Sequence, residues 1–101
     1  MSYVYFVQMN IPAEKEAEFN RLYDEEHVPA LSKMPGVHKI TRYQLEKTND
    51  PDMPKYLTIY EVDSPEVVEN DAWRKASDGR EWAPKIRPHM TERYHSFFRK
   101  I

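Results

Sequence analysis

Cysteine is absent from this chain of 101 residues, which excludes disulfides, thiolate nucleophiles and cysteine-ligated zinc. Glycine occurs only twice, so the sequence holds no glycine-rich phosphate loop and no GxSxG nucleophile motif. The 15 basic and 17 acidic residues are spread along the chain and form no basic stripe. Because nucleic-acid binding depends on such a stripe, we expect no nucleic-acid partner.

No apolar run approaches the roughly 20 residues that a membrane-spanning helix needs. The N-terminal strand-like segment also lacks the basic start of a signal peptide. We therefore expect a cytoplasmic protein with no membrane partner. The length fits a single hydrophobic core, so residues 1–101 are assigned to one domain without a linker.

Aromatic and β-branched residues predict four strands, at 3–9, 37–46, 56–62 and 91–101. Helical spacing predicts one helix that starts near Pro12 and another that starts at Ser64 and ends near Gly79. Pro29 disfavours helical geometry at the residue before it, so the first helix should end or kink at about His27. The order predicts an α+β, ferredoxin-like βαββαβ fold with a four-stranded antiparallel sheet.

Both faces of the predicted sheet carry apolar side chains, although two helices on one face can cover only that face. A monomer with such a patch in water is unusual. Two sheets packed face to face would cover it, because the uncovered face is the same on each copy. We therefore predict a homodimer.

The segment 19–31, which contains the run YDEEHVP at 23–29, leads into Pro35-Gly36-Val37. It resembles the histidine-proline signature before the second strand in small EthD-like and stress-responsive proteins of the dimeric α+β barrel superfamily. The resemblance runs nearly end to end and implies two ferredoxin-like sheets packed as a dimeric α+β barrel. The superfamily includes cofactor-free monooxygenases, lactone isomerases, polyketide cyclases, haem-degrading proteins and members without known activity, so membership leaves the function open.

His27 is the leading candidate for a catalytic acid or base, because histidine titrates near neutrality. A helix C-terminus and the nearby Asp24 favour the imidazolium, whereas burial in an apolar pocket opposes it. The alternative is a structural histidine that caps the helix or bonds a backbone carbonyl. Asp24 and His27 lie one helical turn apart, but no third ligand is signalled, so we predict no metal site.

Substrate contacts are expected from aromatic side chains that combine apolar area with one polar tip, and from one acid. The predicted substrate-binding residues are Tyr23, Tyr43, Tyr60, Glu61 and Trp73. Glu61 shares one side of its strand with apolar residues, which would raise its pKa; the alternative is a carboxylate that reaches water. Packing is the alternative role for the aromatic residues. Arg42 and Arg93 are candidates for holding an anionic ligand.

Three functions remain open, and none of them requires a cofactor. The first is a small-molecule-binding homodimer that acts as a cofactor-independent isomerase, cyclase or lyase, with His27 moving a proton next to a carbonyl of an aromatic or polyketide-like compound. The second is a non-catalytic ligand-binding or stress-associated barrel protein with the same cavity. The third is a cofactor-free monooxygenase in which the substrate itself activates oxygen.

Overall fold

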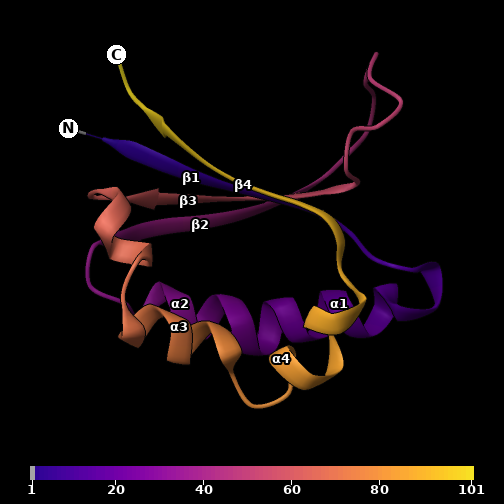
Figure 1. Cartoon of the computed structure of the whole chain (residues 1–101), viewed down its shortest axis with the longest axis horizontal. Helices are drawn as coiled ribbons and strands as arrows, with labels where there is room; N and C mark the ends of the chain where they lie inside the picture. The colour runs from indigo at the N-terminus through magenta and orange to yellow at the C-terminus, as the bar shows by residue number, and fades with distance from the viewer. Residues whose placement is uncertain (1) are drawn as a thin grey trace.

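The computed structural model describes residues 2–101 and consists of a four-stranded sheet and a layer of helices (Figure 1). Of the predicted domain 1–101, only Met1 lies outside the described residues. The strands are β1 (Tyr3–Asn10), β2 (Val37–Gln44), β3 (Tyr56–Val62) and β4 (Thr91–Arg99). Their order is β2-β3-β1-β4 and each neighbouring pair is antiparallel, which confirms the predicted ferredoxin-like fold.

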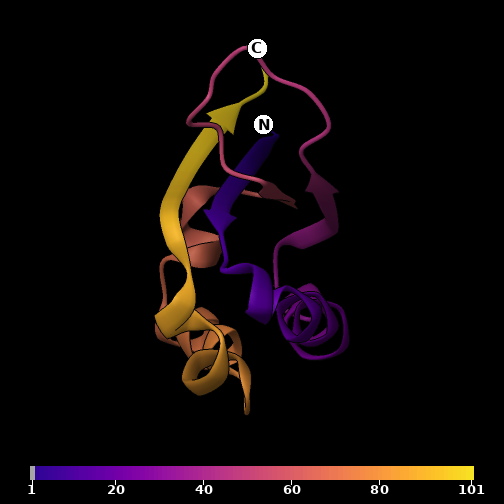
Figure 2. The same cartoon turned by 90° about the vertical axis from the view of Figure 1, so that its right-hand side faces the viewer.

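The α-helices all lie on one side of the sheet, as the two perpendicular views show (Figure 2). The α-helices are α1 (Glu16–Leu22), α2 (Val28–Ser32), α3 (Asp71–Asp78) and α4 (Trp82–Lys85). Three short 3-10 turns are η1 (Ala13–Lys15), η3 (Pro65–Val68) and η4 (Arg87–His89), and η2 (Tyr23–His27) is a π-helical turn.

The helical path continues beyond His27 to Ser32, so of the two predicted outcomes the helix does not end there but is interrupted by an irregular turn that finishes at His27. The π-turn η2 joins α1 to α2, and the Val28 N–H donates to the carbonyl of Tyr23, five residues earlier. A wider turn relieves the contact between a proline ring and the carbonyl four residues before it. Pro29 then lies in the first turn of α2, where its missing N–H is tolerated.

The second predicted helix is divided in the structure. Ser64 precedes only the 3-10 turn η3, and the cap of α3 is Asn70, whose Oδ1 accepts the backbone N–H of Trp73 at 2.8 Å. An asparagine side chain competes for backbone donors and so favours a new helix start. The predicted end near Gly79 is correct, since α3 stops at Asp78 and Gly79 has φ +60°.

The core between sheet and helices consists of two clusters of buried side chains. Cluster one contains Met9, Phe19, Leu22, Tyr23, Tyr56, Trp82 and Ile86. Cluster two contains Tyr5, Leu31, Tyr60, Val62 and Trp73. The helices therefore pack on the sheet through two clusters. Side chains of both clusters line the space where the clusters adjoin.

The outer face of the sheet carries no helix (Figure 1). Tyr43, Tyr94 and Phe98 lie on this face and are 51%, 51% and 55% exposed. The structure thus leaves a largely apolar sheet face uncovered in one copy of the chain. Among residues 2–101, no helix has the length and apolar character needed to cross a bilayer.

Candidate functional site

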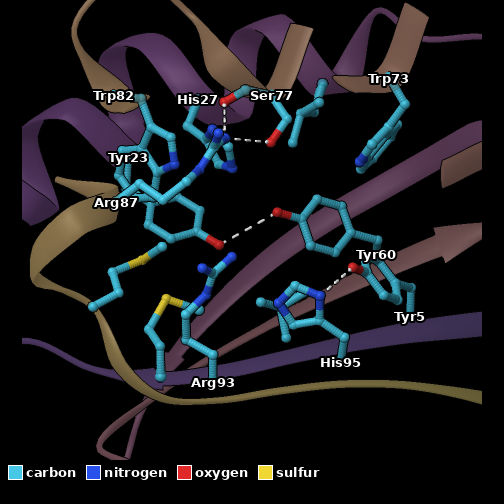
Figure 3. A pocket seen from close by; sticks show the side chains of 14 residues that line it. Tyr5, Tyr23, His27, Tyr60, Trp73, Ser77, Trp82, Arg87, Arg93 and His95 are labelled. Atoms are coloured by element: carbon cyan, nitrogen blue, oxygen red, sulfur yellow. Dashed lines mark hydrogen bonds between the residues drawn. The ribbon is translucent and has the colours of Figure 1, made fainter. Parts of the chain in front are cut away.

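A cavity of about 50 Å³ lies where the two core clusters adjoin, between the sheet and the helices (Figure 3). Side chains of β1, β3 and β4 form its floor, and side chains of the helical layer form its roof. Aromatic rings make up much of the wall, including both tryptophans of the chain, Trp73 and Trp82. The site is therefore apolar in bulk, with a few polar groups that determine its chemistry.

His27 projects into this wall from the π-turn and is only 6% exposed. Its ring stacks on Trp82 with 4.3 Å between centroids and 21° between planes, and it meets the edge of Tyr23 at 5.0 Å. The Nδ1 atom of His27 is buried and has no hydrogen-bond partner within residues 2–101. Stacking therefore fixes the ring, while one polar atom is left available to a ligand.

Burial, and to a smaller extent the cations of Arg87 and Arg42, lower the pKa of His27 to about 3. Glu26 and a backbone interaction with Ser77 act in the opposite direction and are outweighed. The imidazole is thus neutral at pH 7, so of the two opposing influences named from the sequence, burial outweighs the helix end and Asp24. A neutral imidazole donates one hydrogen bond and accepts another.

The acidic residues beside His27 have partners of their own. Arg42 Nη1 donates to Asp24 Oδ1 at 2.9 Å, and the Arg42 guanidinium lies over the Tyr23 ring at 4.3 Å. Glu25 forms an exposed pair with Arg21 at 3.7 Å. Arg42 is therefore occupied by Asp24 and by the cluster-one aromatics.

Glu26 has the most specific role of the three acids. Its Oε1 accepts the backbone N–H groups of Arg80, Glu81 and Trp82 at 2.5, 2.9 and 3.1 Å. Partial burial raises the pKa of Glu26, but these backbone hydrogen bonds outweigh that effect and the pKa is lowered. The residue before His27 thus holds the chain segment that carries Trp82, on which His27 stacks.

Three hydroxyl groups form a chain along the sheet side of the cavity. Thr58 Oγ1 donates to Tyr23 Oη at 2.7 Å, and Tyr23 Oη lies 3.3 Å from Tyr60 Oη. Burial raises the pKa of both tyrosines, so both phenols stay protonated at neutral pH. Because the Tyr23 oxygen already accepts a hydrogen bond from Thr58, the chain delivers a hydroxyl donor toward the cavity.

The side of the cavity at β4 is more polar. Tyr5 Oη lies 3.1 Å from His95 Nδ1, and burial raises the pKa of Tyr5 to about 12. Burial also lowers the pKa of His95, and Arg93 adds to this effect. Arg87 and Arg93 complete this part of the wall (Figure 3).

The structure divides the residues predicted from sequence between the two faces of the sheet. The four that line the cavity together are His27, Tyr23, Tyr60 and Trp73. Tyr43 and Glu61 face the opposite side, where they pair in register with Leu57 and Val4 and are exposed. Glu61 therefore lies in contact with solvent rather than in an enclosed apolar region.

Sequence reasoning did not find Arg87 and His95 as members of the wall. For His95 the alternation of β4 carried a signal, because it shares a face with Phe97 and is in register with Val7 of β1. Arg87 follows Gly79 in a region of short turns, where no periodicity shows which side chains point inward. Within the described part of the chain, no three histidine, aspartate or glutamate side chains gather as a metal site.

The sheet topology gives the chain the ferredoxin-like fold. Residues 2–100 match the family model described as Domain of unknown function (DUF4286), and the chain belongs to that family. A comparison with curated proteins gives no match.

Solved structures with the same fold span nearly the whole chain. An EthD family protein from Bacillus halodurans has a TM-score of 0.70 at 14% identity, with all of both chains covered. A mutant of MhuD, the heme-degrader of Mycobacterium tuberculosis, with two manganese protoporphyrin IX molecules per active site, has a TM-score of 0.72 at 16% identity, covering 98% and 94%. A dimeric ferredoxin-like protein of unknown function from Thermobifida fusca has a TM-score of 0.64 at 10% identity, covering 99% and 92%. At these identities the likeness shows the fold alone, which agrees with the predicted ferredoxin-like fold of one chain.

Proposed function

We propose that this protein is a homodimer that binds a small molecule in the cavity beside His27. The observation that carries the proposal is the buried, unpaired Nδ1 of His27. A buried polar atom without a partner costs about 1–3 kcal/mol, and such atoms are rare in folded proteins. A ligand polar group that reaches Nδ1 removes this cost, so the site gains free energy when it is filled.

The polar groups of the wall suit a ligand that contains a carbonyl. Tyr23 and Tyr60 present protonated phenols, and a carbonyl oxygen accepts from such donors. Trp73 and Trp82 provide flat apolar surfaces that suit a ring. We therefore expect a carbonyl-containing aromatic or polyketide-like compound, bound with its oxygen toward the phenols.

The size of the inner cavity limits what enters it. Its volume of about 50 Å³ is far below the roughly 300 Å³ at which pockets for drug-sized ligands begin. It accommodates a carbonyl group or the edge of one ring. A porphyrin does not fit this cavity. Although the MhuD mutant with a similar fold binds manganese protoporphyrin IX, the cavity of this chain gives no support for haem chemistry.

Catalysis, where it occurs, depends on a neutral His27. An imidazole whose pKa is about 3 is a weak base at pH 7, but it holds a carbonyl or an enol in place through hydrogen bonds. This arrangement suits a cofactor-independent isomerase, cyclase or lyase in which the substrate proton is already acidic. The same low pKa favours the second candidate, a barrel protein that binds its ligand without turnover.

The decisive comparison is between His27→Gln and the matched control His38→Gln. His38 is exposed and its Nε2 lies 2.5 Å from Asp63 Oδ1, away from the cavity. We expect His27→Gln to weaken ligand binding and, in an enzyme, to lower kcat, whereas His38→Gln changes neither. Unchanged binding and turnover in a folded His27→Gln protein would contradict the role of His27. Oxygen uptake with a bound substrate distinguishes a monooxygenase from the other candidates.

Dimerisation follows from the uncovered face of the sheet. Tyr43, Tyr94 and Phe98 are exposed on it, and the same face on a second copy is self-complementary about a two-fold axis. The dimeric state of the Thermobifida fusca protein supports the same arrangement. Light scattering should give twice the chain mass, and Phe98→Glu should shift the protein toward the monomer. A wild-type monomer at micromolar concentration would contradict the dimer.

A further inference from the structure

A groove of about 310 Å³ continues the inner cavity toward solvent. The two hollows share six lining residues: Tyr5, Trp73, Ser77, Arg87, Arg93 and His95. They therefore form one site, with a narrow inner end at His27 and a wide outer end. The outer volume falls within the range of pockets that hold small organic ligands.

Three arginines line this groove, and two of them are already paired. Arg74 forms an ion pair with Asp71 on the surface of α3. Arg87 donates to Asp78 Oδ1 at 2.5 Å and to the carbonyl of Ser77 at 3.1 Å. Asp78 is the one carboxylate lining the groove, and Arg87 occupies it.

The guanidinium of Arg93 has neither a hydrogen bond nor an ion pair with any group in residues 2–101, in contrast to Arg74 and Arg87. In Figure 3 its side chain extends from β4 into the site, toward the hydroxyls of Tyr23 and Tyr60. Its charge lowers the pKa of the Tyr5 phenol against the effect of burial. The guanidinium thus acts on the interior of the site and has no anion of its own.

The backbone around Arg93 is irregular. The register between β1 and β4 shifts between Gln8 and Asn10, so that Glu92 and Arg93 both lie opposite Met9. Glu92 has φ +49°, and its Oε2 accepts the side-chain N–H of Asn10 at 2.8 Å. Bulges and left-handed non-glycine residues of this kind are enriched beside functional sites.

We propose that the ligand of this site carries a carboxylate, which Arg93 binds in the groove while the uncharged end of the ligand reaches the inner cavity. A guanidinium presents two parallel N–H groups that match the two oxygens of a carboxylate. Trp73 and Tyr5 then contact the body of the ligand, and Tyr23 and Tyr60 contact its far end. The inference rests on the proposed binding function and names the substrate class: small aromatic or aliphatic carboxylic acids.

Matched pairs of acid and amide test the inference, because each pair differs in charge and hardly in shape. Suitable pairs are 4-hydroxybenzoate with 4-hydroxybenzamide, 2-naphthoate with 2-naphthamide, and hexanoate with hexanamide. Both tryptophans line the site, so the two indole N–H signals in a ¹H–¹⁵N spectrum report binding. We expect at least one acid to bind with a Kd tenfold or more below that of its amide.

The Arg93→Gln variant should abolish this preference and leave the Kd of the amide unchanged. Arg21→Gln, at an exposed arginine that pairs with Glu25 and lines neither hollow, should leave both values within twofold. Circular dichroism of each variant checks the fold. Loss of binding for the acid alone identifies Arg93 as the carboxylate partner.

The contrary outcomes separate the two proposals. Equal affinity for acid and amide in the wild-type protein, or an acid preference that survives Arg93→Gln, overturns the carboxylate inference and leaves the small-molecule site standing. Tighter binding of phenyl phosphate than of every acid overturns it in favour of a phosphate. Absence of any indole shift with all six compounds overturns the carboxylate inference together with the proposed binding function.

Discussion

The imidazole of His27 and the indole of Trp82 are stacked, with ring centroids 4.3 Å apart and planes inclined by 21°. Glu26, the residue before His27, accepts the backbone N–H of Trp82 at 3.1 Å. Two consecutive residues of the π-turn therefore hold the tryptophan, one by its ring and one by its backbone. The three acids before His27 each have a hydrogen-bond or ion-pair partner. Among the described side chains, the buried polar atom without a partner is His27 Nδ1.

Stability should depend on pH through His27. The free imidazole has a pKa of 6.5, whereas in the folded protein burial lowers the pKa to about 3. Between these values the unfolded chain binds more protons, so stability is full above pH 6.5 and falls on acidification by up to about 1.4 kcal/mol per pH unit. Urea unfolding at pH 7, 6 and 5 measures this slope. These pH values stay above the ordinary pKa values of carboxyl groups.

His27→Gln should flatten that slope, and His38→Gln, at an exposed ring, should not. His95, whose pKa is also lowered by burial, contributes a slope of the same sign that both variants retain. Equal slopes in the wild-type and His27→Gln proteins would contradict a buried, neutral His27.

Removing the Glu26 carboxylate should destabilise the fold. In Glu26→Ala the backbone N–H groups of Arg80, Glu81 and Trp82 lose their shared acceptor. Hydrogen bonds to a charged group contribute about 1.5–3 kcal/mol, and solvent replaces part of this at the exposed positions, so we expect a loss of about 2 kcal/mol. Glu25→Ala, which removes only an exposed pair, should cost no more than about 0.5 kcal/mol. Similar losses for both variants in urea unfolding would show that Glu26 has no special role.

Gly79 should not tolerate a side chain. Its φ of +60° and ψ of −158° lie in a region that is essentially restricted to glycine, and an added Cβ would meet Glu26 Oε1 at 2.0 Å. We expect Gly79→Ala to lower the free energy of unfolding by at least about 1–3 kcal/mol. A double-mutant cycle with Glu26→Ala measures the steric part. Strictly additive losses would mean that the Cβ does not displace the carboxylate.

The Tyr23 hydroxyl should stabilise the fold through Thr58. In Tyr23→Phe the Thr58 hydroxyl, buried with 1% exposure, loses the acceptor that lies 2.7 Å away. A buried hydroxyl without its partner costs about 1–3 kcal/mol. Tyr94→Phe is the matched control, because Tyr94 lies on the outer face and is half exposed. Thermal unfolding of the two variants compares them, and an equal melting temperature would contradict the buried hydroxyl chain.

Local patterns were sufficient for the strands and for most of the helices. Strand 56–62 is predicted to the residue, because β-branched and aromatic side chains with a period of two indicate a strand in any context. For the first helix the sequence predicted an end or a kink at about His27, and it could not choose between them, because Pro29 acts on local geometry but the π-turn before it accommodates the ring. Asn70 replaces Ser64 as the cap of α3 for a similar reason, since two capping residues compete and packing selects between them.

The candidate site was only partly predictable. His27, Tyr23, Tyr60 and Trp73 meet in one cavity, whereas Tyr43 and Glu61 lie across the sheet from it. A strand sequence shows which residues share a face but not which face the helices cover when both are apolar. Arg42 and Arg93 looked equivalent in the sequence, yet Asp24 occupies Arg42 and Arg93 has no partner in residues 2–101.

The sequence by itself determined the order of elements, the ferredoxin-like topology and the presence of a histidine at the turn before Pro29, because these follow from short-range periodicity and turn chemistry. Only the tertiary structure decided that His27 is neutral, that Glu26 holds the segment carrying Trp82, and that Arg93 faces the cavity unpaired. These properties depend on burial and on contacts between residues that are far apart in the chain. Glu26 and Trp82, for example, are separated by 56 positions. Such contacts exist only once the helices lie on the sheet.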